Sequence, residues 1–216
     1  MGLEPEGTVL DLGAGTGKLT RALVPRFARV IAVEPDAAMR TVLEEVVPGA
    51  ESLAGNAEAI PLEDGAVDAI FSGEAFHWFA TSSALDEIAR VLRPRGCFAF
   101  LWNIFQGEEP PLSAEAKALL DEAFERGGVP GLQRVLSGRW RDAFEGSGFE
   151  ELHEGTYVHE LYVDRETFVA RMLSVSSIAV QPEEDRAEFE ERLRELMPAE
   201  GTRQRFRVDT YWTRLV

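Results

Sequence analysis

A buried strand that runs into a glycine loop constrains this chain more than any other feature. The stretch from Val9 to Lys18 reads VLDLGAGTGK, apolar at first and then with glycines at positions 13, 15 and 17. Glycine lets a backbone turn sharply and approach a ligand closely, and a helix that begins after the loop presents free amides. The segment therefore predicts a strand, a loop and a helix that bind a nucleotide-like ligand.

The first half of the chain alternates apolar runs with helical patterns. Strands are predicted at 8–12, 29–34, 50–54, 67–72 and 97–103, and helices at 18–27, 37–47 and 84–92. Asp36 is a plausible N-cap of the second helix. Continuous apolar strands separated by amphipathic helices favour a parallel sheet covered on both faces, with ligands at the carboxyl ends of the strands.

The second half has a different pattern. An acidic linker is predicted at 106–111, helices at 113–126, 138–145, 164–173 and 182–197, and strands at 151–163 and 205–216. The two late strands are expected to pair antiparallel at the sheet edge, and the helices between them to form a lid over the ligand end. The predicted fold is α/β: a Rossmann-like, doubly wound, mostly parallel seven-stranded sheet with an antiparallel C-terminal edge strand and a helical cap.

One domain of residues 1–216 is expected from the length. Within it, residues 1–105 form the cofactor-binding half, 106–203 the cap helices and a late strand, and 204–216 the final edge strand.

Charge and cysteine content exclude several classes of function. With 22 basic and 38 acidic residues the net charge is −16, which argues against nucleic-acid and anionic membrane partners. The single cysteine, Cys97, excludes an intramolecular disulfide, no metal-ligand set is recognisable, and the chain start lacks a signal-peptide pattern. A cytoplasmic protein that acts on a small molecule, without a metal, is expected. Monomer and homodimer remain equally open.

Two ligands compete for the glycine loop. A nicotinamide dinucleotide site has the spacing G-x-G-x-x-G, whereas this loop has G-x-G-x-G. Glu34 ends the second predicted strand about 20 residues after Gly13, where a carboxylate binds ribose hydroxyls. That acidic residue suits either a nicotinamide cofactor or S-adenosylmethionine, so it does not decide between them.

Further segments carry a resemblance to a known family. The loop resembles motif I of the class I S-adenosylmethionine-dependent methyltransferases, and three later segments resemble that family's next motifs in the same order: GNAEAIPL at 55–62, VDAIFS at 67–72 and IARVLRPRG at 88–96. EAFHWF at 74–79 and VDTYWTR at 208–214 resemble the methyltransferase-11, trans-aconitate-methyltransferase-like subgroup. The resemblance implies an enzyme of class EC 2.1.1.- that methylates a small-molecule O, N or C atom, a carboxylate being plausible, and releases S-adenosylhomocysteine.

The resemblance also implies the residues that bind the cofactor. They are Asp11, Gly13, Ala14, Gly15, Gly17, Glu34, Pro35, Asn56, Ala57 and Ser72. Asn56 stands where the family usually has Asp, and its amide oxygen can still accept from the adenine amino group.

His77 is the titratable side chain of the loop after the fourth predicted strand, where the acceptor is expected. Its ordinary pKa, about 6.5, suits a general base. The alternative is that His77 only lines the pocket with Trp78. Trp102 and Asn103, after the fifth strand, are further candidates for the acceptor pocket.

One departure from the family concerns the start of the chain. Relatives usually carry an N-terminal helix that helps close over the cofactor, whereas seven residues precede Thr8 here. We expect either a shortened start or a more open pocket. An open pocket would suit a second class of function, a non-catalytic S-adenosylmethionine-binding sensor or partner protein. An NAD(P)-dependent oxidoreductase is the third alternative.

Overall fold

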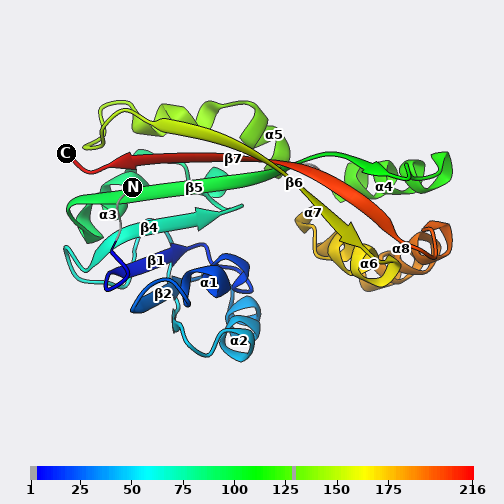
Figure 1. The fold of residues 1–216 in the computed structure, drawn as a ribbon, viewed down its shortest axis with the longest axis horizontal. Coiled ribbons are helices and arrows are strands. Elements are labelled where there is room, and N and C mark those ends of the chain that lie inside the picture. The colour runs from blue at the N-terminus through cyan, green and yellow to red at the C-terminus, as the bar shows by residue number, and fades with distance from the viewer. Residues whose placement is uncertain (1–3, 128–129) are drawn as a thin grey trace. The chain divides into compact units, whose positions relative to one another are not determined.

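The computed structural model describes residues 4–127 and 130–216. The first half follows the predicted alternation (Figure 1). Its elements are β1 (Thr8–Leu12), α1 (Lys18–Leu23), β2 (Arg29–Val33), α2 (Ala37–Val46), β3 (Glu51–Leu53), β4 (Val67–Gly73), the 3-10 helix η1 (Phe76–Trp78), α3 (Ser82–Val91) and β5 (Leu92–Glu109). The later elements are α4 (Ala114–Gly127), α5 (Pro130–Leu136), the 3-10 helix η2 (Arg139–Phe144), β6 (His153–Val163), α6 (Arg165–Leu173), α7 (Ser176–Ala179), α8 (Glu183–Leu196) and β7 (Thr202–Arg214).

Seven strands form one sheet in the order β3-β2-β1-β4-β5-β7-β6. The pairs β1–β2, β2–β3, β1–β4 and β4–β5 are all parallel. The strand order reverses between β1 and β4, and such a switch point is where doubly wound sheets bind ligands. The predicted α/β fold with a mostly parallel seven-stranded sheet is confirmed, with the correction that β6, and not the C-terminal strand β7, stands at the sheet edge.

Several boundaries differ from the predicted ones, most clearly those of the first helix and of the fifth strand, which begins at Leu92 instead of Cys97. The first helix ends at Leu23 instead of Phe27, because Pro25 follows and has no amide hydrogen for a helical bond. The predicted linker at 106–111 is strand as far as Glu109, since β5 continues well past Asn103. Local composition marks the acidic, proline-containing segment as a loop, but pairing within the sheet overrides that signal.

The chain divides into two compact units. The first comprises residues 1–102, 134–156 and 209–216, and the second comprises residues 103–133 and 157–208. Strands β5, β6 and β7 contribute residues to both units.

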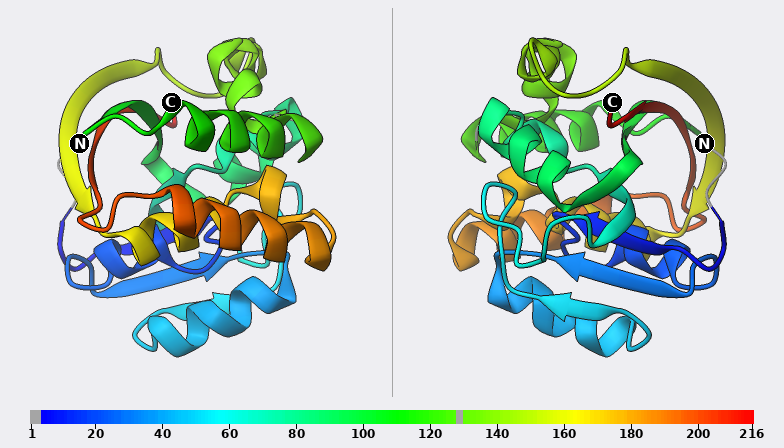
Figure 2. Two further views of the ribbon diagram at one scale, coloured as in Figure 1. Left: turned by 90° about the vertical axis from the view of Figure 1, so that its right-hand side faces the viewer. Right: turned by 90° about the vertical axis from the view of Figure 1, so that its left-hand side faces the viewer.

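Strand alternation gives the first unit two apolar layers. On one face of the sheet, Val9, Ala69 and Cys97 pack against Leu19 and Leu23 of α1. Because neighbouring residues of a strand point to opposite faces, the residues next to them build a different layer. Figure 2 shows α2, in light blue, beside the strands at the β3–β2 edge.

Aromatic rings fill the other face. Phe98, Phe100 and Trp102 are alternate residues of β5 and therefore point the same way. Phe76 of η1 and Trp140 of η2 lie against them, with ring centroids 4.5 Å apart for Phe76–Phe100 and 5.0 Å for Trp102–Trp140. This aromatic layer holds η1 in place at the end of β4.

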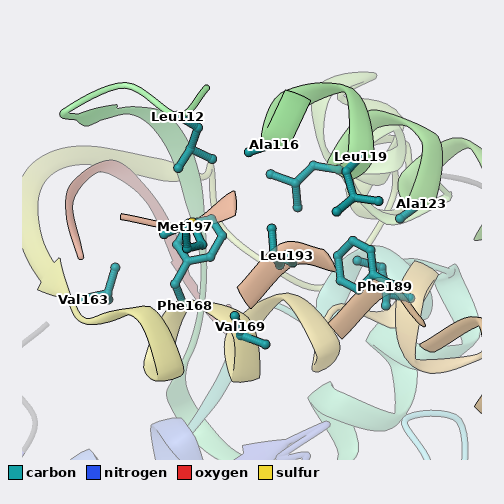
Figure 3. Close-up of a cluster of buried hydrophobic side chains, with 12 residues drawn as sticks. Leu112, Ala116, Leu119, Ala123, Val163, Phe168, Val169, Phe189, Leu193 and Met197 are labelled. Carbon is teal, nitrogen blue, oxygen red and sulfur yellow. The ribbon is translucent and has the colours of Figure 1, made fainter. Parts of the chain in front are cut away.

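The second unit has an apolar core of its own, drawn in Figure 3. It is contributed by α4, α6, α7 and α8 together with flanking residues, at the spacing expected of helices that bury one face. The buried residues are Leu112, Ala116, Leu119, Leu120, Ala123, Val163, Phe168, Val169, Ile178, Phe189, Leu193 and Met197. None of the helices described in 4–127 and 130–216 has the length and apolar character needed to cross a membrane.

Candidate active site

The glycine loop is anchored to the end of β2. The amides of Gly13 and Ala14 both donate to the carbonyl oxygen of Val33, at 2.9 and 3.1 Å. Gly13 and Gly15 have φ angles of 73° and 56°, a left-handed conformation that glycine adopts without strain. Gly17, also left-handed, is the residue before α1. The loop thus carries the chain from β1 into α1 as the sequence predicts.

The two glycines face different surroundings. A Cβ atom added at Gly13 would lie 2.7 Å from the Cβ of Ala75, in the loop after β4. A Cβ added at Gly15 would meet no atom within 4 Å. Gly13 is therefore required by packing against the β4 loop, whereas Gly15 borders open space in which a ligand can lie against bare backbone.

Glu34 points its carboxylate at this loop. It is 7% exposed, and its Oε2 accepts from the Gly15 amide at 2.9 Å while Oε1 accepts from the Asp36 amide at 3.0 Å. The carbonyl oxygens of Glu34 and Pro35 accept from Arg40 Nη1 at 2.8 and 2.7 Å. Each carboxylate oxygen retains a second lone pair, so the group can still accept from ribose hydroxyls.

Asp11 is a buried carboxyl beneath the loop. Its Oδ2 accepts from Thr20 Oγ1 at 2.6 Å, and its Oδ1 has no hydrogen-bond partner within the described chain. Burial raises the pKa of Asp11 to about 7, and the negative charge of Glu34 adds to the effect. Ser72 of β4 is likewise fully buried, with a hydroxyl that has no partner among the described residues.

Asn56 and Ala57 follow β3. Asn56 is exposed and its Oδ1 accepts from the Glu58 amide at 3.0 Å, while Ala57 is buried. Side chains of α3 and of its N-cap Thr81 bind the residues that follow. Thr81 Oγ1 donates to the Glu58 carboxylate, and Arg90 donates to the carbonyl oxygens of Ile60 and Leu62. These contacts join residues far apart in sequence, so no local sequence pattern indicates them.

The loop after β4 brings His77 and Trp78 next to the glycine loop, through the contact of Ala75 with Gly13. His77 is half-buried, and its Nδ1 accepts from Trp102 Nε1 at 3.0 Å. Burial, followed by the positive charge of Arg134, lowers the pKa of His77 to about 4. The imidazole is therefore neutral at pH 7, and the accepting Nδ1 assigns the hydrogen to Nε2.

Arg134 of α5 is a site residue that the sequence did not suggest. Its guanidinium carbon lies 5.1 Å from the ring centroid of Trp78, which is 46% exposed. No ion pair to Arg134 is found within the described residues. It comes into the site through tertiary packing, and a lone arginine on a short helix carries no signal in sequence.

Trp102 and Asn103, the remaining candidates for the acceptor pocket, have different surroundings. Trp102 is 1% exposed and meets His77, whereas Asn103, the next residue of β5, is exposed and belongs to the second unit. There its Oδ1 lies 3.3 Å from His159 Nε2. The structure thus unites three of the four predicted acceptor residues: His77, Trp78 and Trp102.

The arrangement suits the cofactor that the sequence suggests. Open space beside Gly15, the orphaned Asp11 oxygen and the Glu34 carboxylate lie at the carboxyl ends of β1 and β2. Among residues 4–127 and 130–216, no three His, Cys, Asp or Glu side chains are grouped as metal ligands.

Comparisons with known proteins agree with this geometry. A family model described as a methyltransferase domain matches residues 10–100. An uncharacterized methyltransferase of Schizosaccharomyces pombe is 36% identical over 202 residues, covering 91% of this chain and 78% of that protein. A malonyl-acyl-carrier-protein O-methyltransferase of Methylococcus capsulatus is 43% identical over 102 residues, which cover 44% of this chain and 37% of that protein.

Among solved structures, the YcgJ protein of Bacillus subtilis has the same fold, with a TM-score of 0.62 at 18% identity over 99% of this chain and 93% of that one. Because an S. pombe methyltransferase matches nearly the whole chain, the family is established. The protein belongs to the class I S-adenosylmethionine-dependent methyltransferases, with a methyltransferase-11 domain.

Proposed function

We propose that this methyltransferase transfers the methyl group of S-adenosylmethionine to a carboxylate oxygen of a small acceptor. The observation that carries the proposal is the set of side chains at the end of β4. His77 is neutral with a hydrogen on Nε2, and Arg134 carries a positive charge beside Trp78. Both side chains are able to donate hydrogen bonds, so together they suit an acceptor that offers oxygen lone pairs.

The cofactor half of the proposal assigns a role to each predicted residue. Gly13, Ala14, Gly15 and Gly17 receive the methionine end with Asp11, Glu34 holds the ribose hydroxyls, Asn56 and Ala57 meet the adenine edge, and Pro35 and Ser72 line the site. When bound, S-adenosylmethionine supplies an electrophilic methyl group on a positively charged sulfur. The chain's task is then to align the acceptor with that group and to exclude water, and orientation alone supplies much of the rate.

Of the two roles considered for His77, the geometry favours lining the pocket. A general base needs a free lone pair and a pKa near the working pH. The Nδ1 lone pair already accepts from Trp102, and the pKa of about 4 makes the imidazole a weak base. The Nε2–H remains able to donate to an acceptor oxygen and so to orient it.

A carboxylate acceptor needs no base. It is ionised at neutral pH, and the planar guanidinium of Arg134 matches its two oxygens. The M. capsulatus relative is named for O-methylation of a malonyl group, which supports an oxygen acceptor. The net charge of −16 argues for a small acceptor rather than a polyanion such as nucleic acid.

The test uses methyl-labelled S-adenosylmethionine with separate pools of small carboxylic acids, amines and phenols. A carboxyl methyl ester releases labelled methanol in mild alkali, whereas N-methyl and aryl methyl products are stable. We expect alkali-labile label from the acid pool. An alkali-stable product would overturn the carboxylate assignment and return His77 to consideration as a base. Failure of the folded protein to bind S-adenosylhomocysteine in calorimetry would overturn the cofactor site itself.

Two arginine variants sharpen this test. Arg134→Ala should raise the KM for the acid by about tenfold or more, because a charge-assisted contact is lost, and leave S-adenosylhomocysteine affinity unchanged. Arg139→Ala, an exposed arginine in η2, is the matched control and should change neither quantity. An unchanged KM in Arg134→Ala would remove Arg134 from the proposal.

A further inference from the structure

The segment Asn56–Asp64, here called the 56–64 loop, connects β3 to β4 without joining the main sheet. Its backbone forms one isolated bridge, between Asn56 and Ala59. A loop with so little regular structure needs other contacts to hold a fixed shape. Those contacts come from side chains on α3 and from the residue that caps it, and they act at both ends of the helix.

Glu58 is fixed at the start of α3. Its Oε1 accepts from Thr81 Oγ1 at 3.1 Å and from Ser83 Oγ at 3.0 Å. Thr81 is also the N-cap of α3, accepting from the Ala84 amide at 3.2 Å. A carboxylate at a helix N-terminus is further stabilised by the helix dipole. This contact ties the beginning of the loop to a residue that closely follows Trp78 in the chain.

Glu87 and Arg90 hold the other end of the loop from the last turns of α3. Glu87 Oε1 accepts from the Ile60 amide at 2.9 Å, and Arg90 donates to the carbonyls of Ile60 and Leu62 at 3.1 and 2.8 Å. Arg90 Nη1 also meets Asp64 Oδ1 at 2.7 Å. The two side chains are paired to each other at 2.7 Å. Both polar groups of the Ile60 peptide backbone are thereby satisfied by this one pair.

Pro61 transmits this restraint toward Asn56. It lies between the two carbonyls that Arg90 holds, and its ring is packed on Gly55. A Cβ added at Gly55 would lie 2.6 Å from Pro61 Cδ and 3.3 Å from Val33 Cγ1. Gly55, the residue directly before the loop, is therefore packed between the Val33 side chain of β2 and the ring of Pro61.

We propose that Arg90, Glu87 and Glu58 are positioning residues for adenine recognition. They fix the 56–64 loop so that Asn56 and Ala57 present their polar groups to the adenine edge of the cofactor. The inference rests on the adenine role given to Asn56 under the proposed function. It adds that this role depends on α3. The N-cap of α3, Thr81, closely follows η1, which contains His77 and Trp78.

The experiment compares binding of S-adenosylhomocysteine with binding of S-inosylhomocysteine, in which an oxygen replaces the adenine amino group. Wild type should prefer the adenine compound. Arg90→Lys keeps the charge but loses the planar fork, so the preference should shrink by about tenfold. A purely structural arginine would lower the thermal midpoint and leave the ratio of the two affinities unchanged, and that outcome would contradict the proposal.

Four further variants make the result decisive. In Asn56→Ala the preference should already be lost, and adding Arg90→Lys should change the ratio no further, as coupled residues do. Glu58→Ala alters an exposed side chain and should reduce the preference in a protein that folds normally. Arg93→Lys is the matched control, because Arg93 pairs with Asp68 at 2.6 Å and donates to the carbonyl oxygen of Gly65 at 3.3 Å, and both partners lie beyond the last residue of the loop.

Failure of this proposal and failure of the proposed cofactor site have different signatures. A wild-type protein that binds both compounds equally contradicts the adenine role of Asn56 and the positioning role together. A wild-type protein that prefers adenine, with Arg90→Lys and Glu58→Ala retaining the full preference, contradicts the positioning role alone.

Discussion

The two units of this protein are built by different rules. In the first unit the predicted cofactor residues are held largely by backbone groups: loop amides bound to Val33, left-handed glycines, and a carboxylate bound by amides. In the second unit, apolar side chains at helical spacing converge on a core and no short motif stands out. The difference teaches that a site made from backbone geometry leaves a compact signature in sequence, whereas a packed helical core leaves only periodicity.

The largest expected effect is a loss of unfolding free energy in the second unit that leaves cofactor binding in the first unit unchanged. Phe168 is 2% exposed in the second core, and Phe168→Ala should cost about 3–5 kcal/mol of unfolding free energy because it leaves a cavity. Affinity for S-adenosylhomocysteine, measured by calorimetry well below the unfolding transition, should stay within about twofold, because this core belongs to the second unit and the predicted cofactor loop to the first.

The matched variant in the first unit is Leu23→Ala. Leu23 is buried in α1, directly after the glycine loop, so both the unfolding free energy and the affinity should fall. If Phe168→Ala abolished binding in a protein that is still folded, cofactor binding would depend on the core of the second unit, contrary to this prediction.

Glu34→Ala should weaken S-adenosylhomocysteine binding by about 100-fold, because under the proposed function it removes the acceptor of the ribose hydroxyls as well as the acceptor of the Gly15 amide. Glu34→Gln keeps one acceptor oxygen and should lie between that variant and wild type. Glu44→Ala, an exposed carboxylate of α2, is the control. Equal affinities for Glu34→Ala and Glu44→Ala in calorimetry would remove Glu34 from the site.

Two glycine substitutions with similar backbone strain distinguish packing from ligand contact. Gly13→Ala and Gly15→Ala each place a side chain at positive φ, which costs about 1 kcal/mol. Gly13→Ala also drives a methyl group into Ala75, so it should lower the thermal midpoint more. Gly15→Ala meets no protein atom, so its main loss should be in cofactor affinity. Parallel thermal melts and calorimetry check the pair, and identical losses in both assays would show that Gly15 does not border the ligand.

Much of the first unit could be predicted from sequence because its signals are local. Apolar runs mark β1, β2 and β4, and Asp36 caps α2 by accepting from the Met39 amide as expected. Glu34 could be found from its spacing to the loop, since the end of β2 must lie beside the end of β1 in a parallel sheet.

What could not be predicted depends on contacts between distant segments. Arg90 and Glu58 act on the 56–64 loop through tertiary hydrogen bonds, and Arg134 reaches Trp78 from α5. The insertion of β7 between β5 and β6 is likewise a matter of pairing, which strand composition does not encode. No sequence pattern indicates that Nδ1 of His77 accepts a hydrogen bond from Trp102, which is the contact that makes His77 a weaker candidate for a base.

Asp11 allows the finest separation of backbone from side-chain contributions. Its pKa of about 7 in the folded protein lies well above the ordinary value of about 4, so the folded state binds more protons than the unfolded chain between those pH values. The unfolding free energy should therefore fall as pH rises from 4 to 7. Cofactor affinity should move the other way, because only the ionised carboxylate attracts the ammonium group of the methionine end.

We expect S-adenosylhomocysteine affinity to rise by up to about tenfold from pH 6 to pH 8, with proton release on binding, since a bound cation lowers the pKa of the carboxyl. Asp11→Asn keeps the acceptor for Thr20 but cannot ionise, so the portion of both pH dependences that is due to Asp11 should disappear. Calorimetry in two buffers of different ionisation enthalpy measures the released proton. An affinity that rises equally in wild type and Asp11→Asn would assign the pH dependence to another group and leave Asp11 as a purely structural support of the loop.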